Sequence, residues 1–85
     1  MDIRILGTGC ARCRQLYEQT EKIVQQLGLP ATLSKVEKLD EIMGYRVLMT
    51  PALVIDGEVK AAGRLPTEAE LTTWLTTAAD KPKGR

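Results

Sequence analysis

The feature that most restricts the fold of this chain is a short apolar strand that runs directly into an amphipathic helix. Residues 3–6 are apolar apart from Arg4 and stop at Gly7, which predicts a strand followed by a flexible turn. Apolar residues then recur at steps of three and four up to Gly28, which predicts a helix over about residues 11–27. The apolar stripe of this helix consists of Leu16, Tyr17, Thr20, Ile23, Val24 and Leu27. The chain therefore opens as a βα unit of an α/β fold.

The middle of the chain predicts a second strand, a short helix and a third strand. Residues 31–36 alternate apolar and polar side chains, as a half-buried strand does. Residues 38–43 fit a short helix that ends at Gly44. Residues 47–55 are largely apolar and predict a buried strand with Pro51 at its beginning, where no N–H is needed for a strand ladder.

A tight turn and a capped helix close the chain. Asp56-Gly57 is a strong two-residue hairpin signal, so residues 58–62 should run antiparallel to residues 52–55. Thr67 and Glu70 form a capping box, which predicts the start of a final helix. The apolar stripe of this helix consists of Leu71, Trp74, Leu75 and Ala78, and the pattern places Trp74 in the core rather than in a functional site.

The predicted order is β-α-β-α-β-β-α, in a single domain of residues 1–79. The first β-α-β unit should be parallel with a right-handed crossover, and the hairpin adds an antiparallel pair, which gives a four-stranded mixed sheet with helices on both faces. With 85 residues, 44% of them hydrophobic, the chain can form one modest core. We assign Met43 and Met49 to that core rather than to a thioether metal site. Residues 80–85 have no apolar period and are expected to form a disordered tail.

The charge balance and the N-terminal sequence argue against several classes of function. Lys and Arg number 12 against 11 Asp and Glu, so the net charge of +1 provides no field that would attract nucleic acid or an anionic membrane. The apolar run before Gly7 is too short for a signal peptide or a membrane span. We therefore expect a cytoplasmic monomer with no nucleic-acid partner and no membrane insertion. In a reducing compartment, two closely spaced cysteines are more often redox-active or metal-binding than structural.

The two cysteines, Cys10 and Cys13, form a CxxC pair at the start of the first predicted helix. Unpaired N–H groups and the helix dipole stabilise a thiolate at such a position. Cys10 precedes the body of the helix and is the candidate nucleophile. Cys13 lies one turn further in and is the candidate resolving residue. The reversible Cys10–Cys13 disulfide would then carry the chemistry, and no other cofactor is expected.

Arg12 lies between the two cysteines, and its role has two interpretations. A cation close to Cys10 would favour the thiolate further. Alternatively, the guanidinium lies on the solvated side of the helix and has no effect on the thiol. The sequence leaves both interpretations open, so we treat Arg12 as a candidate for electrostatic modulation of Cys10.

Together these motifs resemble the thioredoxin superfamily, most closely its small glutaredoxin-like, redox-active disulfide proteins from bacteria and archaea. The resemblance covers about residues 2–78 and rests on the CxxC pair, on Thr50-Pro51-Ala52 before an apolar strand, on the Asp-Gly hairpin, and on Gly63 before the capped helix. It implies a thiol–disulfide oxidoreductase that acts on a disulfide-containing protein or a small-thiol partner and needs an electron donor. It also implies that Pro51 is cis and that Thr50 contacts an extended substrate.

The chain departs from the best-studied members of that superfamily around the cysteines. Thr8 and Gly9 stand where an aromatic residue usually precedes the first cysteine, and Ala11-Arg12 replaces the usual dipeptide, so no redox potential can be transferred. The region after Gly63 lacks the paired acids that hold glutathione in many glutaredoxins. The first strand has no carboxylate after Asp2, so the sequence assigns no residue to proton transfer.

A metal-binding module for Cu(I) or Zn is the main alternative, because small copper carriers also present CxxC between a first strand and a first helix. Three features count against it. Thr8 stands where such carriers usually have Met, the order of elements differs from theirs, and the strand after Thr50-Pro51 has no role in them. Tetrahedral zinc would need two further ligands, which in a chain with no His and no third Cys could come only from carboxylates or a second chain. A binding module regulated by disulfide formation, without turnover, is a third hypothesis that the sequence leaves open.

Overall fold

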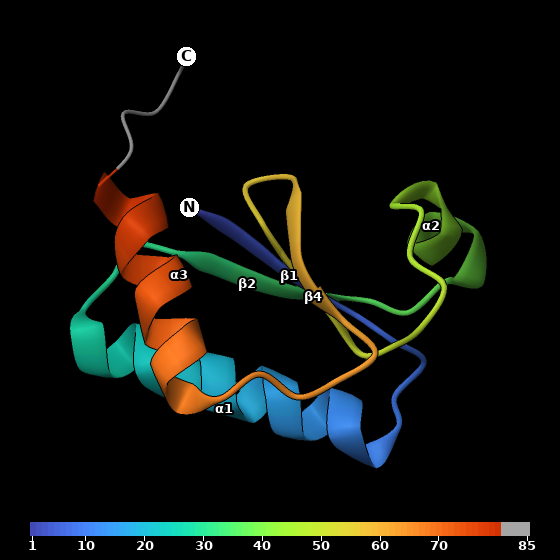
Figure 1. Cartoon of the computed structure of the whole chain (residues 1–85), viewed down its shortest axis with the longest axis horizontal. Helices are drawn as coiled ribbons and strands as arrows, with labels where there is room; N and C mark the ends of the chain where they lie inside the picture. The colour runs from blue at the N-terminus through green and yellow to red at the C-terminus, as the bar shows by residue number, and fades with distance from the viewer. Residues whose placement is uncertain (81–85) are drawn as a thin grey trace.

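The computed structural model describes residues 1–80, and their elements follow the predicted order β-α-β-α-β-β-α (Figure 1). The elements are β1 (Asp2–Leu6), α1 (Ala11–Leu27), β2 (Thr32–Val36), α2 (Leu39–Gly44), β3 (Ala52–Ile55), β4 (Glu58–Ala62) and α3 (Glu68–Asp80). α3 thus includes Asp80, the first residue of the segment predicted as a tail. The rest of that segment, residues 81–85, lies outside the described residues.

The strands form one mixed sheet in the order β2-β1-β3-β4. β1 pairs with β2 in parallel, with Asp2 opposite Thr32, and it pairs with β3 in antiparallel orientation. β3 and β4 form the predicted hairpin, whose register shifts between Leu53 and Val54. Its turn residues, Asp56 (φ 49°) and Gly57 (φ 83°), both have the positive φ that a tight hairpin turn requires. The predicted mixed sheet is therefore confirmed.

Alternate side chains of the central strands build two apolar layers, one on each face of the sheet. The larger layer packs β1 and β3 against α1 and α3, and consists of Ile3, Ile5, Leu16, Ile23, Leu53, Ile55, Leu71 and Leu75. The smaller layer lies under α2 and consists of Leu6, Val36, Ile42, Ala52 and Val54. Figure 1 shows α1 and α3 beside each other and α2 apart from them. Helices thus cover both faces, as predicted, and Trp74 packs at the edge of the larger core.

β3 begins at Ala52, directly after Pro51, as the position of the proline predicted, and the apolar residues 47–49 before it do not belong to the strand. The partner strand β1 ends at Leu6, which pairs with Ala52, so no neighbouring backbone continues the ladder beyond that pair. The chain before it passes through Thr50 and the cis-bonded Pro51 instead of a strand. As a result, the side chain of Leu48 is 99% exposed.

The assignment of two methionines to the core is wrong. Met43 and Met49 are 63% and 64% exposed. Met43 lies on α2, which has six residues and buries Ile42 alone. Met49 lies in the irregular segment before β3. An apolar residue contributes to the core only where its element presents it to the sheet, and neither of these positions does so.

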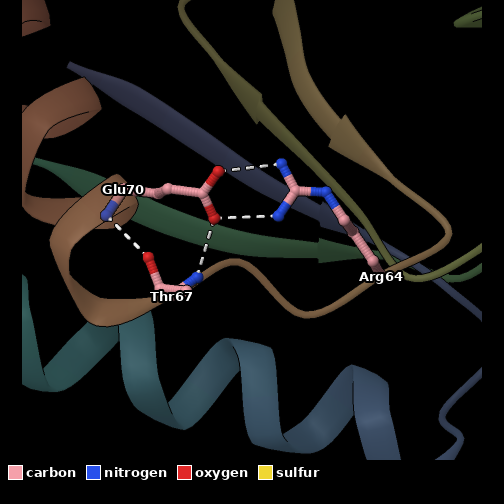
Figure 2. A network of polar contacts seen from close by, with 3 residues as sticks. All are labelled: Arg64, Thr67 and Glu70. Atoms are coloured by element: carbon pink, nitrogen blue, oxygen red, sulfur yellow. Dashed lines mark hydrogen bonds and ion pairs between the residues drawn. The ribbon is translucent and has the colours of Figure 1, made fainter.

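The start of α3 confirms the predicted capping box (Figure 2). The Glu70 backbone N–H donates to Thr67 Oγ1 at 3.1 Å, and the Thr67 backbone N–H donates to Glu70 Oε1 at 2.9 Å. Arg64 forms a bidentate ion pair with the same carboxylate: its two terminal guanidinium nitrogens donate to Glu70 Oε1 at 2.8 Å and to Glu70 Oε2 at 3.0 Å. The Arg64 hydrogen bond, followed by the Thr67 N–H, lowers the pKa of Glu70 to about 2. This network fixes the connection between the hairpin and α3.

None of the helices within residues 1–80 combines the length and the hydropathy that are needed to cross a lipid bilayer.

Candidate active site

Cys10 occupies the N-cap position of α1, directly after the turn that leaves β1. Its backbone is extended (φ −69°, ψ 168°), and its carbonyl accepts the N–H of Arg14 at 3.1 Å. Its Sγ atom accepts the backbone N–H of Cys13 at 3.3 Å, which satisfies one of the unpaired donors of the first helical turn. The side chain is exposed. An electron-rich sulfur therefore faces solvent at the positive end of a helix.

Cys13 lies one turn further along α1 and is only 6% exposed. Its Sγ atom packs against the backbone of Gly7, so closely that a Cβ atom at Gly7 would overlap it. The Sγ atoms of the two cysteines lie 2.7 Å apart in a hydrogen bond, and both cysteines are free thiols. The predicted pair is thus brought together with one exposed and one buried sulfur.

The two thiols differ in acidity. The pKa of Cys10 is lowered, first by the hydrogen bond from the Cys13 side chain and next by the Cys13 backbone N–H. The pKa of Cys13 is raised, first by burial and next by the hydrogen bond to Cys10. Because the thiolate is the nucleophilic form, Cys10 is the sulfur that ionises more readily and is placed to attack first, and Cys13 must lose a proton before it can react.

Thr50 lies beside Gly7, the residue against which the Cys13 sulfur packs, and Pro51 follows it. The peptide bond between them is cis, as the family resemblance implies. Thr50 Cβ is 3.9 Å from the position that a Cβ atom at Gly7 would take, and that position also contacts Cys13. The N–H of Gly63 donates to the Pro51 carbonyl at 2.9 Å, which ties this turn to the end of β4. Pro51 is buried and Thr50 is exposed, so the threonine is open to a ligand next to the redox pair.

Arg12 is exposed on the first turn of α1. Its backbone N–H is among the donors that lower the pKa of Cys10. The main chain at this position therefore assists the thiolate, while an effect of the Arg12 guanidinium stays a prediction.

The structure also reveals two features that the sequence analysis missed. A cavity adjoins Cys13, and its wall includes Glu37, which directly follows β2. The signal for Glu37 was present, because β1 and β2 are parallel and their carboxyl ends therefore lie at the same edge of the sheet. The second feature is an open groove of about 350 Å³, which runs from the segment before Thr50 to β4. Its apolar lining consists of Tyr45, Val47, Leu48, Met49, Val59 and Ala62.

A metal centre has little support within residues 1–80. Three or more His, Cys, Asp or Glu side chains do not converge there in a way that could hold a metal ion.

Comparison with known proteins gives a consistent result. Residues 1–76 match the family model described as thioredoxin domain. A protein named thioredoxin from Methanothermobacter thermautotrophicus is 37% identical over 76 residues, which cover 89% of this chain and 99% of that protein. A protein named thioredoxin from Methanocaldococcus jannaschii is 39% identical over 73 residues, which cover 86% of this chain and 84% of that protein.

Proposed function

The chain belongs to the thioredoxin domain family and is a thiol–disulfide oxidoreductase, and from this premise we propose that Cys10 attacks the substrate disulfide and Cys13 releases the product. One observation carries the division of roles. The exposed Cys10 sulfur and the buried Cys13 sulfur are 2.7 Å apart, with the pKa of Cys10 lowered and that of Cys13 raised. The metal-carrier alternative is not favoured by the comparisons.

The proposed reaction has two exchange steps. The Cys10 thiolate attacks one sulfur of the substrate disulfide, forms a mixed disulfide with it, and expels the other sulfur as a thiolate. The Cys13 thiolate then attacks Cys10 Sγ, which forms the Cys10–Cys13 disulfide and expels the second substrate sulfur. The substrate gains two electrons and the cysteine pair loses two. A dithiol or thiol donor returns the pair to the reduced form, and the couple needs no further cofactor.

The proposed substrate is a protein disulfide, and the proposed compartment is the cytoplasm, where thiol donors keep such a pair cycling. Thr50 supports this proposal, since it is exposed next to the redox pair and its backbone can pair with an extended segment of substrate. The chain acts as a monomer in this scheme, because both sulfurs and the Thr50–Pro51 turn come from one copy.

Turnover of a protein disulfide tests the proposed function. With insulin as substrate and a small dithiol as reductant, the protein should accelerate reduction far beyond the dithiol alone, as followed by precipitation of the free insulin chains. Bovine serum albumin at the same concentration is the control for non-specific effects. If the cysteine pair cycles between dithiol and disulfide but insulin reduction stays at the background rate, the proposal of a general protein disulfide as substrate fails. Turnover of a small disulfide then separates a small-thiol oxidoreductase from a redox-regulated binding module.

The apolar groove beside Thr50 supports a polypeptide substrate. Leu48 is 99% exposed, and it lies two residues before Thr50 in the sequence. A segment that flanks a substrate disulfide and reaches Cys10 would run over this surface and cover part of the leucine. Covering about half of a leucine side chain contributes about 1 kcal/mol, which is roughly a fivefold effect on binding.

Replacing this leucine should therefore weaken protein substrates selectively. We expect Leu48→Ser to raise the KM for insulin about fivefold and to leave the rate with a small aromatic disulfide unchanged. Leu39→Ser is the matched control, because Leu39 is 64% exposed and lies on α2 outside the lining of the groove. Equal KM values for the wild type and Leu48→Ser would remove the groove from the substrate-binding surface.

A further inference from the structure

A cavity of about 170 Å³ lies behind the redox pair, between the start of α1 and the end of β2. The Cys13 side chain forms part of its wall, together with Gly7 and Gly9 of the turn before the helix. Ile5 of β1 adds an apolar side chain, and three charged residues complete the wall: Arg14 from α1, Lys35 from β2, and Glu37 directly after β2. A water molecule takes about 30 Å³ in the liquid, so the cavity has room for several. It is therefore a partly open cavity, with both apolar and charged side chains on its wall, that adjoins a buried thiol.

The backbone holds Glu37 at this position. The N–H of Gly7 donates to the Val36 carbonyl at 3.0 Å, which joins the turn before Cys10 to the last residue of β2. Glu37 is the next residue along the chain, and its Oε2 atom lies 3.7 Å from the position that a Cβ atom at Gly9 would take. The carboxylate therefore lies beside Gly9, the residue that precedes Cys10, and Glu37 and Cys13 both line the cavity.

The release step requires a proton acceptor at this place. Cys13 is buried, and it reacts only after its thiol has lost the proton. Cys10 cannot accept that proton during release, since its sulfur is then bound to the substrate. Arg14 and Lys35 are cations with no lone pair to offer, and Lys35 Nζ lies over the Tyr17 ring, 4.7 Å from its centre. Among the described residues that line the cavity, Glu37 is the side chain that can accept a proton.

We propose that Glu37 accepts the proton of the Cys13 thiol, through water in the cavity, in the step that releases the reduced product. This inference rests on the proposed function of the cysteine pair. It assigns the residue for proton transfer to the end of the second strand, whereas the first strand holds no carboxylate after Asp2.

The Cys13 S–H bond breaks, and its proton passes through water to the Glu37 carboxylate. The Cys13 thiolate forms a bond to Cys10 Sγ, while the bond between Cys10 and the substrate sulfur breaks and leaves its electron pair on the substrate. The substrate thiolate takes a proton from solvent, and Glu37 returns its proton to solvent. Arg14 and Lys35, the other charged groups on the cavity wall, provide positive charge while the Cys13 thiolate exists.

A pH jump isolates this step. A mixed disulfide between Cys10 and a thionitrobenzoate is formed in acid, where Cys13 stays protonated, and the release of the coloured thiolate is followed after a jump to higher pH. We expect Glu37→Gln to slow release by about 100-fold at about pH 6 to 7, the low end of what a general base contributes. The difference should vanish near about pH 9.5, where hydroxide takes the proton directly. Glu37→Asp should recover most of the rate.

Two controls keep the outcome specific. Glu41→Gln removes an exposed carboxylate of α2 that does not line this cavity, and it should release at the wild-type rate. The attack of Cys10 on the small disulfide, measured separately, should be nearly unchanged in Glu37→Gln. Release in Glu37→Gln at the wild-type rate at every pH, or slowed by the same factor at every pH, would overturn the proposal. If the wild type itself forms no mixed disulfide at Cys10, the proposed function fails instead.

Discussion

Replacing Cys10 by serine is expected to abolish the reduction of insulin, with a loss of at least about 10³-fold, because a hydroxyl is not ionised at neutral pH and cannot attack a disulfide. Replacing Cys13 by serine should have a different result. The first step stays intact in Cys13→Ser, but no second sulfur can displace the substrate. The variant should therefore accumulate a covalent adduct at Cys10 and stop after one attack.

Mass spectrometry of the intact protein separates the two outcomes. After incubation with a disulfide substrate, Cys13→Ser should carry one substrate sulfur fragment on Cys10, and Cys10→Ser should carry none. The pKa directions give a second measurement, since alkylation of the wild type by iodoacetamide should select Cys10 and should persist below the pH range of an ordinary thiol. An adduct on Cys13 in the Cys10→Ser variant, with turnover retained, would reverse the roles of the two sulfurs.

The sign of the pH effect on stability follows from the same shift. The pKa of Cys10 is lower in the folded chain than in the unfolded chain, so the folded state binds the proton less readily. The contribution of the Cys10 thiolate to stability is therefore present above the unfolded pKa and is lost as the pH falls through the folded pKa. The contribution of Cys13 to stability has the opposite pH dependence, because burial raises its pKa in the folded chain. That contribution is present below the unfolded pKa and is lost as the pH rises through the folded pKa.

The elements that the sequence predicted well are those that local chemistry determines. The helix at Ala11–Leu27 follows from the period of its apolar residues. The hairpin turn follows from the Asp56-Gly57 pair, which readily adopts positive φ, and the capping box follows from the spacing of Thr67 and Glu70. Each of these signals is contained within a few residues, so no tertiary contact is needed to read it. The cysteine pair belongs to the same class, since its position at a helix start follows from the strand, turn and helix around it.

The features that the sequence did not predict depend on where other segments end. Leu48 and Met49 have the composition of a buried strand, but β1 stops at Leu6 and leaves them without a partner. Glu37 directly follows the last residue of β2, and in the sequence it has the pattern of an ordinary solvated charge. Only the parallel pairing of β1 and β2 places it beside the turn that carries Cys10. Both parts of the site arise from strand ends that meet in space.

Replacing Gly7 by alanine should lower the free energy of unfolding by about 2 kcal/mol, because the added methyl group overlaps the Cys13 sulfur. The same Cβ atom would lie 3.2 Å from Cys13 Cβ, so the helix as well as the thiol must shift. The backbone of Gly7 thus forms the surface against which the Cys13 side chain packs. Displacing that sulfur from its position 2.7 Å from Cys10 should also slow product release.

A double-mutant cycle tests this contact through urea unfolding. In a Cys13→Ala background the sulfur is absent, so Gly7→Ala should cost less than about 1 kcal/mol, and the difference between the two backgrounds measures the coupling of the contact. Gly44→Ala is the matched control, because a Cβ atom at Gly44 meets nothing within 4 Å and alanine favours the helix, so the substitution should not lower stability. An equal loss in both backgrounds would mean that Gly7 is required for the path of the turn itself, and that the close packing of glycine on Cys13 does not set the position of the buried thiol.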